Sequence, residues 1–347
     1  MSNPSFRIRW SLILIIFILA ILNYAEIDLC CRYYQEYISL VLQYRDDISI
    51  HCYQEAPDLV YHGIPNACGH NSQGYVDRDH AFEKDPGVYR IVIIGDSIIV
   101  AERAKDPPAV FSRAIEQLLN GADPHRRYEV VKLAVTGYNT TQEIRILKDV
   151  ALRYNPDLIL WSYCLNDPDH PVLHGGRSNG DRGIYFYTPR FFLWTYLAQK
   201  SYYLDEEVRR TVFKCDPKEY HTYLHCLYWD KVAANFAVIA RITRAKNIPV
   251  FFVIHPIFTK VRAFSNYPVE LRKLHHKLAD LAKQNGFVAI DLLTAYKPYS
   301  TRQLCRYRKR NVMDVWHPND RGYEVAERYI VSRLLKFLHL TTEDSSF

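Results

Sequence analysis

The sequence predicts an α/β protein, a three-layer sandwich in which helices cover both faces of a central parallel five-stranded sheet, preceded by an N-terminal transmembrane helix. Two observations predict the sheet. From residue 89 onward, apolar runs alternate with segments of helical length, and these runs are apolar almost throughout, as in strands that are covered on both faces. One apolar stretch near the N-terminus predicts the transmembrane helix.

Five runs have the length and composition of buried strands: residues 89–95, 128–135, 157–164, 249–256 and 287–293. Helices are expected between and after them, at about 107–120, 140–154, 230–246, 268–285 and 319–338. In the last helix, apolar residues recur at helical spacing, and Asn319 or Asp320 is placed to cap its start. The alternation predicts a flavodoxin-like sheet of order 2-1-3-4-5, with a ligand site at the carboxyl ends of its strands.

The transmembrane helix is predicted at residues 10–25, which are almost wholly apolar. Arg7 and Arg9 precede this stretch, and Glu26 and Asp28 follow it. The positive-inside rule therefore places the N-terminus in the cytoplasm and the rest of the chain across the membrane. The stretch is short for a membrane crossing, which takes about 17 to 25 residues, so a cleaved signal peptide and a secreted protein are the alternative. The lack of a small-residue cleavage site favours the uncleaved anchor.

After this anchor or signal sequence, residues 1–25, the chain divides into two parts. Residues 26–88 lack a long clear period and contain several turn-forming residues, so we expect an irregular extracytoplasmic lead-in. Residues 89–340 form the predicted domain, in which an aromatic-rich insert at 168–228 interrupts the alternation. Such an insert could form a lid over a ligand site, and packing into the core is the alternative interpretation.

Charge and motif content exclude several classes of protein. The 347 residues include 44 basic and 38 acidic side chains, a balance that gives no sign of a nucleic-acid-binding surface. Five cationic residues between Arg302 and Arg310 could bind an anionic lipid headgroup or an acidic polymer, or could form a solvated loop. HExxH, phosphate-loop and dinucleotide-binding motifs are missing from the sequence. We therefore expect no metal, no cofactor and no nucleic-acid partner.

The cysteine pattern leaves disulfides open. Eight cysteines contain no Cys-x-x-Cys pair and so no zinc-site spacing. In an oxidising compartment, Cys52 with Cys68 and Cys215 with Cys226 would be the closest plausible pairs in the sequence. Spacing alone does not decide connectivity, and free buried thiols explain the cysteines equally well.

Ser97 is a candidate nucleophile because it directly follows the first predicted strand, at the edge where the ligand site is expected. A serine hydroxyl becomes a strong nucleophile only when a nearby base takes its proton. The best candidate for that base is His317, in a loop before the last helix, and Asp314 could hold the imidazole in the required tautomer. Each of these short patterns alone also fits an ordinary turn or a structural cap.

Two further strand ends supply hydrogen-bond donors for a negatively charged oxygen. Gly137 follows the second predicted strand, and its lack of a side chain lets its N–H approach closely. Asn166 follows the third strand, and its side-chain amide can donate. Together with the N–H of Ser97, these groups could form an oxyanion hole. Cys164 lies beside them and is better explained as a small buried residue than as a second nucleophile.

Taken together, these residues resemble the four sequence blocks of the SGNH (GDSL) hydrolases, in the same order. The blocks are Gly-Asp-Ser at 95–97, Gly137, Asn166 in an Asn-Asp pair, and His317 in Asp-x-x-His-Pro-Asn. Residues 71–75 also look like the lead-in of bacterial membrane-linked members, so the resemblance covers residue 71 to about 338. The sequence departs from the family at Ile98, usually leucine, and at Cys164, often glycine, but neither change removes a reacting group.

The resemblance implies the SGNH hydrolase fold and a serine esterase that needs no cofactor. It makes Ser97 the nucleophile, His317 the general acid and base, and Asp314 its partner, while Ser97, Gly137 and Asn166 form the oxyanion hole. The substrate would be a small acyl ester, a lipid ester or an O-acetylated glycan. Two alternatives are an O-acyltransferase of envelope glycans that uses the same residues and a non-catalytic binding module that retains the fold.

Overall fold

The computed structural model describes residues 52–56, 59–100, 110–168, 204–216, 218–259, 261–308 and 312–343. The predicted membrane anchor at 1–25 and most of the predicted insert, residues 169–203, lie outside this part of the chain. Among the helices in the described ranges, none combines the length and the apolar character needed to cross a membrane.

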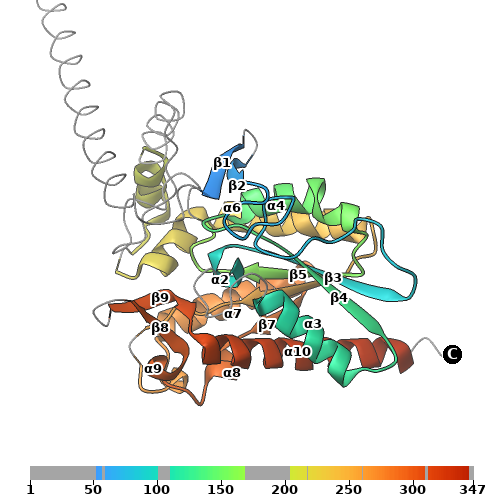
Figure 1. Cartoon of the computed structure of the whole chain (residues 1–347). Coiled ribbons are helices and arrows are strands. Elements are labelled where there is room, and N and C mark those ends of the chain that lie inside the picture. The colour runs from blue at the N-terminus through green and yellow to red at the C-terminus, as the bar shows by residue number, and fades with distance from the viewer. Residues whose placement is uncertain are drawn as a thin grey trace, which may run out of the picture. The chain divides into compact units, whose positions relative to one another are not determined.

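A five-stranded parallel sheet lies at the centre of the domain (Figure 1). Its spatial order is β4-β3-β5-β6-β7, which confirms the predicted order 2-1-3-4-5. The strands β4 and β5 pair with opposite sides of β3, and all three run parallel. Their carboxyl ends are therefore adjacent at one edge of the sheet. In chain order the strands are β3 (Val88–Gly95), β4 (Arg127–Ala134), β5 (Leu158–Tyr163), β6 (Val250–Ile254) and β7 (Val288–Asp291).

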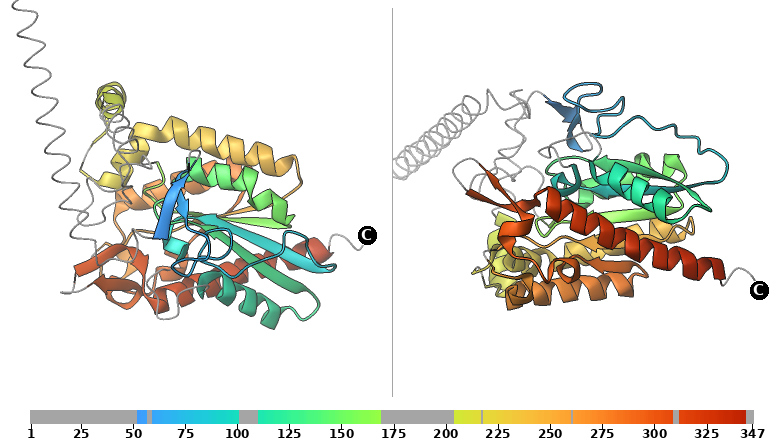
Figure 2. Two further views of the ribbon diagram at one scale, coloured as in Figure 1. Left: turned by 45° about the horizontal axis from the view of Figure 1, so that its top comes forward. Right: turned by 60° about the horizontal axis from the view of Figure 1, so that its bottom comes forward.

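Helices cover both faces of the sheet, as predicted (Figure 2). One face carries α3 (Val110–Ala122) and α10 (Asp320–Glu343), which pack against each other. The other face carries α4 (Thr140–Asp149), α6 (Tyr220–Arg244) and α7 (Val269–Gln284), with α6 in contact with both neighbours. The shorter helical segments are α2 (Ser97–Val100), η2 (Ala151–Tyr154), η3 (Phe264–Asn266), α8 (Leu293–Tyr296) and α9 (Thr301–Leu304).

The hydrophobic core lies on both sides of the central strands. Ile91 and Val92 of β3 point to opposite faces, and both are fully buried. On the face covered by α6, the Trp161 ring packs against Phe236 and Phe252, with ring centroids 4.8 and 4.9 Å apart. The nearly continuous apolarity of these strands therefore reflects helices on both sides.

The ends of two helices are fixed by side-chain caps. Asn319 caps α10, because its Oδ1 accepts the backbone N–H of Gly322 at 3.0 Å. Glu219 caps α6 by accepting the N–H groups of His221 and Thr222. This cap starts α6 ten residues before the helix predicted at 230–246, so α6 includes the end of the segment assigned to the insert.

The described part of the lead-in is more regular than expected. It contains a two-stranded antiparallel sheet of β1 (Tyr53–Ala56) and β2 (Val60–Gly63). A disulfide between Cys52 and Cys68 joins the start of β1 to the turn after β2. These strands are only four residues long, which is too short for a periodic pattern to stand out in the sequence.

Both disulfides that the sequence offered as the closest pairs are present, the second joining Cys215 to Cys226. Cys164 and Cys305 are unbridged and buried. Burial raises the pKa of the Cys164 thiol well above its ordinary value, so the thiol is protonated and a poor nucleophile. Cys164 is therefore a packing residue, as its position predicted.

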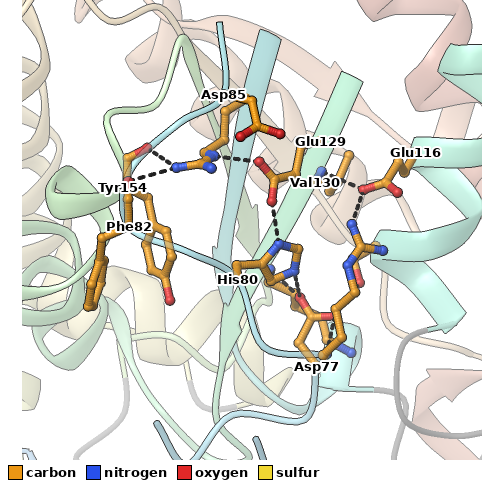
Figure 3. Close-up of polar contacts among 12 residues, drawn as sticks. Asp77, His80, Phe82, Asp85, Glu116, Glu129, Val130 and Tyr154 are labelled. Atoms are coloured by element: carbon orange, nitrogen blue, oxygen red, sulfur yellow. Dashed lines mark hydrogen bonds and ion pairs between the residues drawn. The ribbon is translucent and has the colours of Figure 1, made fainter. Parts of the chain in front are cut away.

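A buried polar network connects the lead-in to the amino-terminal ends of β3 and β4 (Figure 3). His80 lies between two carboxylates, with Nδ1 2.7 Å from Glu129 Oε1 and Nε2 3.5 Å from Asp77 Oδ2. The other oxygen of Glu129 accepts a hydrogen bond from Arg90 Nε at 2.7 Å, and Arg90 also donates to the Tyr154 carbonyl. This network lies at the end of the strands opposite to the predicted site, so its role is to fix the lead-in to the sheet.

Candidate active site

Ser97 is the first residue of α2, and the turn that joins this helix to β3 requires glycine at position 95. A Cβ atom added to Gly95 would lie 2.9 Å from both the Cβ and the carbonyl oxygen of Ser162 on β5. Asp96 shapes the turn, because its Oδ1 accepts the N–H of Ile98 at 3.0 Å. The result is a half-buried serine at the carboxyl end of the central strand.

His317 and Asp314 lie on an antiparallel hairpin of β8 (Cys305–Arg308) and β9 (Val312–Pro318). The sequence predicted a loop at this position, and that prediction was wrong. The hairpin sequence is rich in charged and polar residues and has no apolar run, so the usual strand signal is missing. Arg302 and Arg306 of the predicted cationic cluster fall on α9 and β8, whereas Lys309 and Arg310 lie outside the described residues.

The three predicted triad residues meet in space. His317 Nε2 is 3.1 Å from Ser97 Oγ, and His317 Nδ1 is 3.0 and 3.1 Å from the two carboxylate oxygens of Asp314. Asp314 Oδ1 also accepts the backbone N–H groups of Trp316 and His317, which fixes the carboxylate in place. The Asp314 side chain is fully buried, and the His317 side chain is 17% exposed. An imidazole held in this way can accept a proton from the serine hydroxyl.

Gly137 and Asn166 occupy the turns after β4 and β5, on either side of the turn that carries Ser97. Gly137 has a φ of 76°, a left-handed conformation that favours glycine. Asn166 is half-buried, and its Oδ1 has no hydrogen-bond partner among the described residues. The three segments predicted to form the oxyanion hole therefore meet at one edge of the sheet.

A second serine–histidine contact lies deeper in the protein. Ser162 Oγ is 2.8 Å from His255 Nε2, and both residues are buried. Burial, with a smaller effect of the nearby His275, lowers the pKa of His255 to about 3, so its imidazole is neutral. Because Ser162 is only 1% exposed, a substrate cannot reach it, and the pair is a structural contact.

Sequence reasoning did not single out Glu143 of α4, which is buried near the same edge of the sheet. Its Oε2 accepts the indole N–H of Trp161 at 2.7 Å. A signal was present, because a tryptophan in an apolar strand brings a buried N–H group that needs an acceptor. Within the described ranges, no three His, Cys, Asp or Glu side chains are grouped to hold a metal ion.

Two solved structures illustrate what the chain is similar to. The lipase/acylhydrolase from Enterococcus faecalis is 16% identical and aligns over 71% of this chain and 95% of its own length, with a TM-score of 0.42. A catalytic mutant of an acetylxylan esterase from Geobacillus stearothermophilus is 12% identical and aligns over 70% of this chain and 93% of its own length, also with a TM-score of 0.42. No curated protein matches the sequence.

The family assignment comes from the sequence itself. Residues 93–325 match the model of the GDSL-like lipase/acylhydrolase family. This match covers most of the chain and includes all five residues of the predicted site, from Ser97 to His317. The chain therefore belongs to the GDSL-like lipase/acylhydrolase family and is an ester-hydrolysing enzyme.

Proposed function

We propose that the protein is a serine esterase that cleaves an acyl ester in two steps, through an acyl-enzyme intermediate on Ser97. The observation that carries this proposal is the continuous chain of contacts from the buried Asp314 carboxylate through His317 to Ser97 Oγ. A structural cap would explain the contact between Asp314 and His317. It would not explain why the other imidazole nitrogen faces a half-buried serine hydroxyl at a strand end.

In the first step, Ser97 Oγ attacks the ester carbonyl while its proton moves to His317 Nε2. Asp314 accepts the Nδ1–H of the imidazole, keeps Nε2 unprotonated before the attack, and stabilises the imidazolium that forms. His317 then donates the proton to the departing alcohol as the C–O bond breaks. The buried carboxylate therefore keeps the imidazole in the tautomer that each transfer requires.

The negative oxygen of the tetrahedral intermediate would be bound by the N–H groups of Ser97 and Gly137 and by the Asn166 amide. Asn166 would donate through its side-chain NH2 group, while its Oδ1 accepts no hydrogen bond from a described residue. Water, activated by His317, then releases the acyl group and restores the Ser97 hydroxyl. Removing one oxyanion donor typically costs about 3 to 4 kcal/mol of transition-state stabilisation.

The substrate we propose is an O-acetylated polysaccharide or a lipid ester, and a series of p-nitrophenyl esters of increasing acyl length separates the two. We expect hydrolysis by the wild-type protein and a loss of at least about three orders of magnitude in Ser97→Ala. A preference for acetate supports a glycan substrate, and a preference for long acyl chains supports a lipid. Equal hydrolysis by the two proteins would contradict the proposal. Adding an alcohol acceptor tests the O-acyltransferase alternative, because a transferase would yield the new ester.

We also propose that the enzyme acts outside the cytoplasm, anchored by the apolar residues 10–25. Two disulfides support this location, because such bonds persist in oxidising compartments and are rare in the cytosol. Cell fractionation with mass analysis of the mature N-terminus tests the anchor. A membrane-bound protein of full length is expected, whereas a soluble protein that lacks the apolar stretch would indicate a cleaved signal peptide.

A further inference from the structure

Three buried carboxyl groups belong to the segments that would supply the oxyanion donors. Asp96 directly precedes the candidate nucleophile, and Asp167 directly follows Asn166. Glu143 lies in the first turn of α4, the helix that follows the Gly137 turn. All three residues are at most 3% exposed. Buried acids are costly, so their concentration at this edge of the sheet requires a physical explanation.

In both Glu143 and Asp167, one carboxyl oxygen accepts a hydrogen bond and the other does not. Glu143 Oε2 accepts the Trp161 indole N–H, and Asp167 Oδ2 accepts the Thr140 hydroxyl at 3.2 Å. Thr140 and Glu143 are one helical turn apart and so lie on the same side of α4. Glu143 Oε1 and Asp167 Oδ1 are enclosed, yet neither has a hydrogen-bond partner among the described residues.

Among the described residues, the ionisable groups whose charges act on this pair are Asp96, Tyr163 and Cys164, and none of them carries a positive charge. Tyr163 contacts His225 at 2.9 Å, but burial lowers the pKa of His225 to about 3, so that imidazole is neutral.

Both acids of the pair therefore resist ionisation. Burial, followed by the charges of Glu143 and Asp96, raises the pKa of Asp167 well above its ordinary value. Burial also raises the pKa of Glu143, opposed by its bond from Trp161 and assisted by the charge of Asp96. Two carboxylates buried near one another, without a cationic partner among the described residues, cost several kcal/mol, which favours the state in which the pair keeps one proton.

We propose that Glu143 and Asp167 share a proton and act as a positioning pair that holds the Asn166 turn against α4. The shared proton supplies the O–H group that their two unpartnered oxygens lack. Loss of this proton would place two negative charges between α4 and the Asn166 turn and would push them apart. It would also add negative potential near the oxyanion of the intermediate. The inference rests on the proposed function, because it assigns Asn166 to the oxyanion hole.

The first test compares the pH dependence of p-nitrophenyl acetate hydrolysis in the wild type and in Glu143→Gln. The glutamine keeps an oxygen for the Trp161 N–H, and its amide replaces the shared proton permanently. We expect a kcat near neutral pH within a few-fold of the wild-type value and an unchanged KM. The decline of kcat at alkaline pH should move to higher pH or disappear. Asp167→Asn should shift the alkaline decline in the same direction, which provides a second variant should the first not fold.

Glu327→Gln is the matched control, because Glu327 is also a buried acid with an unpartnered oxygen, and burial raises its pKa to about 8. It lies on α10, outside the pair, so its substitution should leave the alkaline decline of kcat unchanged. An alkaline decline in Glu143→Gln identical to that of the wild type would overturn the proposal.

The second test is independent of activity. Infrared spectra at neutral pH should contain a protonated-carboxyl C=O band that Glu143→Gln or Asp167→Asn removes, and the lack of any such difference would overturn the shared proton. Fluorophosphonate labelling of Ser97 distinguishes a failure of the proposed function from a failure of the proposed carboxyl pair. If the wild-type Ser97 is not labelled, the proposed function fails, and the infrared band still decides the protonation state of the pair. If Ser97 is labelled but the band is missing, only the pair is refuted.

Discussion

His317 Nε2 lies 3.1 Å from Ser97 Oγ although 220 positions separate the two residues in the sequence. The distance depends on how the β8–β9 hairpin is attached to the sheet. The Phe258 N–H, just after β6, donates to the Val315 carbonyl of β9 at 2.7 Å. Asn319, at the end of β9, donates from its side chain to the Cys305 carbonyl of β8. The imidazole is therefore positioned by a main-chain contact between β9 and the segment after β6 and by a side-chain contact to β8.

The Asp314→Asn variant tests the role of the buried carboxylate. The asparagine oxygen can still accept the backbone N–H groups of the hairpin, but its amide would place a donor beside His317 Nδ1 and favour the wrong tautomer. We expect kcat to fall by roughly four orders of magnitude while the protein remains folded. Asp291→Asn is the control, because Asp291 forms a similar contact with His275 Nδ1 at 2.9 Å, away from the serine. Similar activity losses in the two variants would argue against a special role for Asp314.

The Gly95→Ala variant tests the close passage of β3 beside β5. The new methyl group would lie 2.9 Å from two atoms of Ser162, one of them in the backbone, so it cannot be accommodated by a side-chain rotation alone. We expect a loss of about 1 to 3 kcal/mol in the free energy of unfolding, measured with urea, together with lower activity. Gly121→Ala in α3 has open space around the added atom and should leave stability unchanged or raise it by about 0.5 to 1 kcal/mol.

The sheet could be predicted from the sequence because each of its five strands is covered on both faces and is therefore apolar almost throughout. The hairpin that carries His317 could not, because strand pairing there satisfies the backbone while charged side chains such as Arg306 remain partly exposed. The early start of α6 depends on the Glu219 cap, which a glutamate at that position does not signal strongly.

The site residues could be predicted because each follows or precedes an element whose type the sequence indicates. The carboxyl ends of neighbouring parallel strands meet, so Ser97, Gly137 and Asn166 were expected together. Glu143 does not follow a strand, and its only signal was the buried Trp161 N–H, which needs an acceptor. It lies within a helix, where a glutamate usually faces solvent, and only the packing of α4 against Trp161 places it in the interior.

The network around Glu129 predicts a dependence of stability on pH. Burial raises the pKa of Glu129, but hydrogen bonds and charges from His80 and Arg90 outweigh it and lower the pKa from 4.5 to about 2. The stabilisation is therefore present above pH 4.5 and is lost as the pH falls toward about 2. Burial lowers the pKa of His80, but its bonds to Asp77 and Glu129 raise it above 6.5 overall. That contribution is full below pH 6.5 and is lost as the pH rises through the raised value.

Urea unfolding of Glu129→Gln across this range checks the prediction. At pH values between 4.5 and 6.5 the variant should be less stable than the wild type by about 3 kcal/mol, because Arg90 remains buried without its charged partner. The difference should shrink toward pH 2. A constant difference over the whole range would indicate that packing, rather than charge, stabilises this region.

The Cys215–Cys226 disulfide closes a loop with a sequence separation of 11. Replacing both cysteines by alanine should lower the free energy of unfolding by about 3 kcal/mol, because the unfolded chain gains conformational freedom. A reductant should lower the thermal midpoint of the wild type more than that of the variant, because the wild type has both disulfides and the variant keeps only Cys52–Cys68. Equal shifts in the two proteins would contradict the presence of the Cys215–Cys226 bond.

The most direct test of the account is labelling with a fluorophosphonate probe, followed by mass analysis of the modified peptide. The wild-type protein should carry one probe on Ser97 Oγ, and Ser97→Ala should carry none. His317→Ala should react far more slowly, because the serine would lack its base. Equal labelling of the wild type and Ser97→Ala, or full reactivity in His317→Ala, would contradict the claim that these two residues act together.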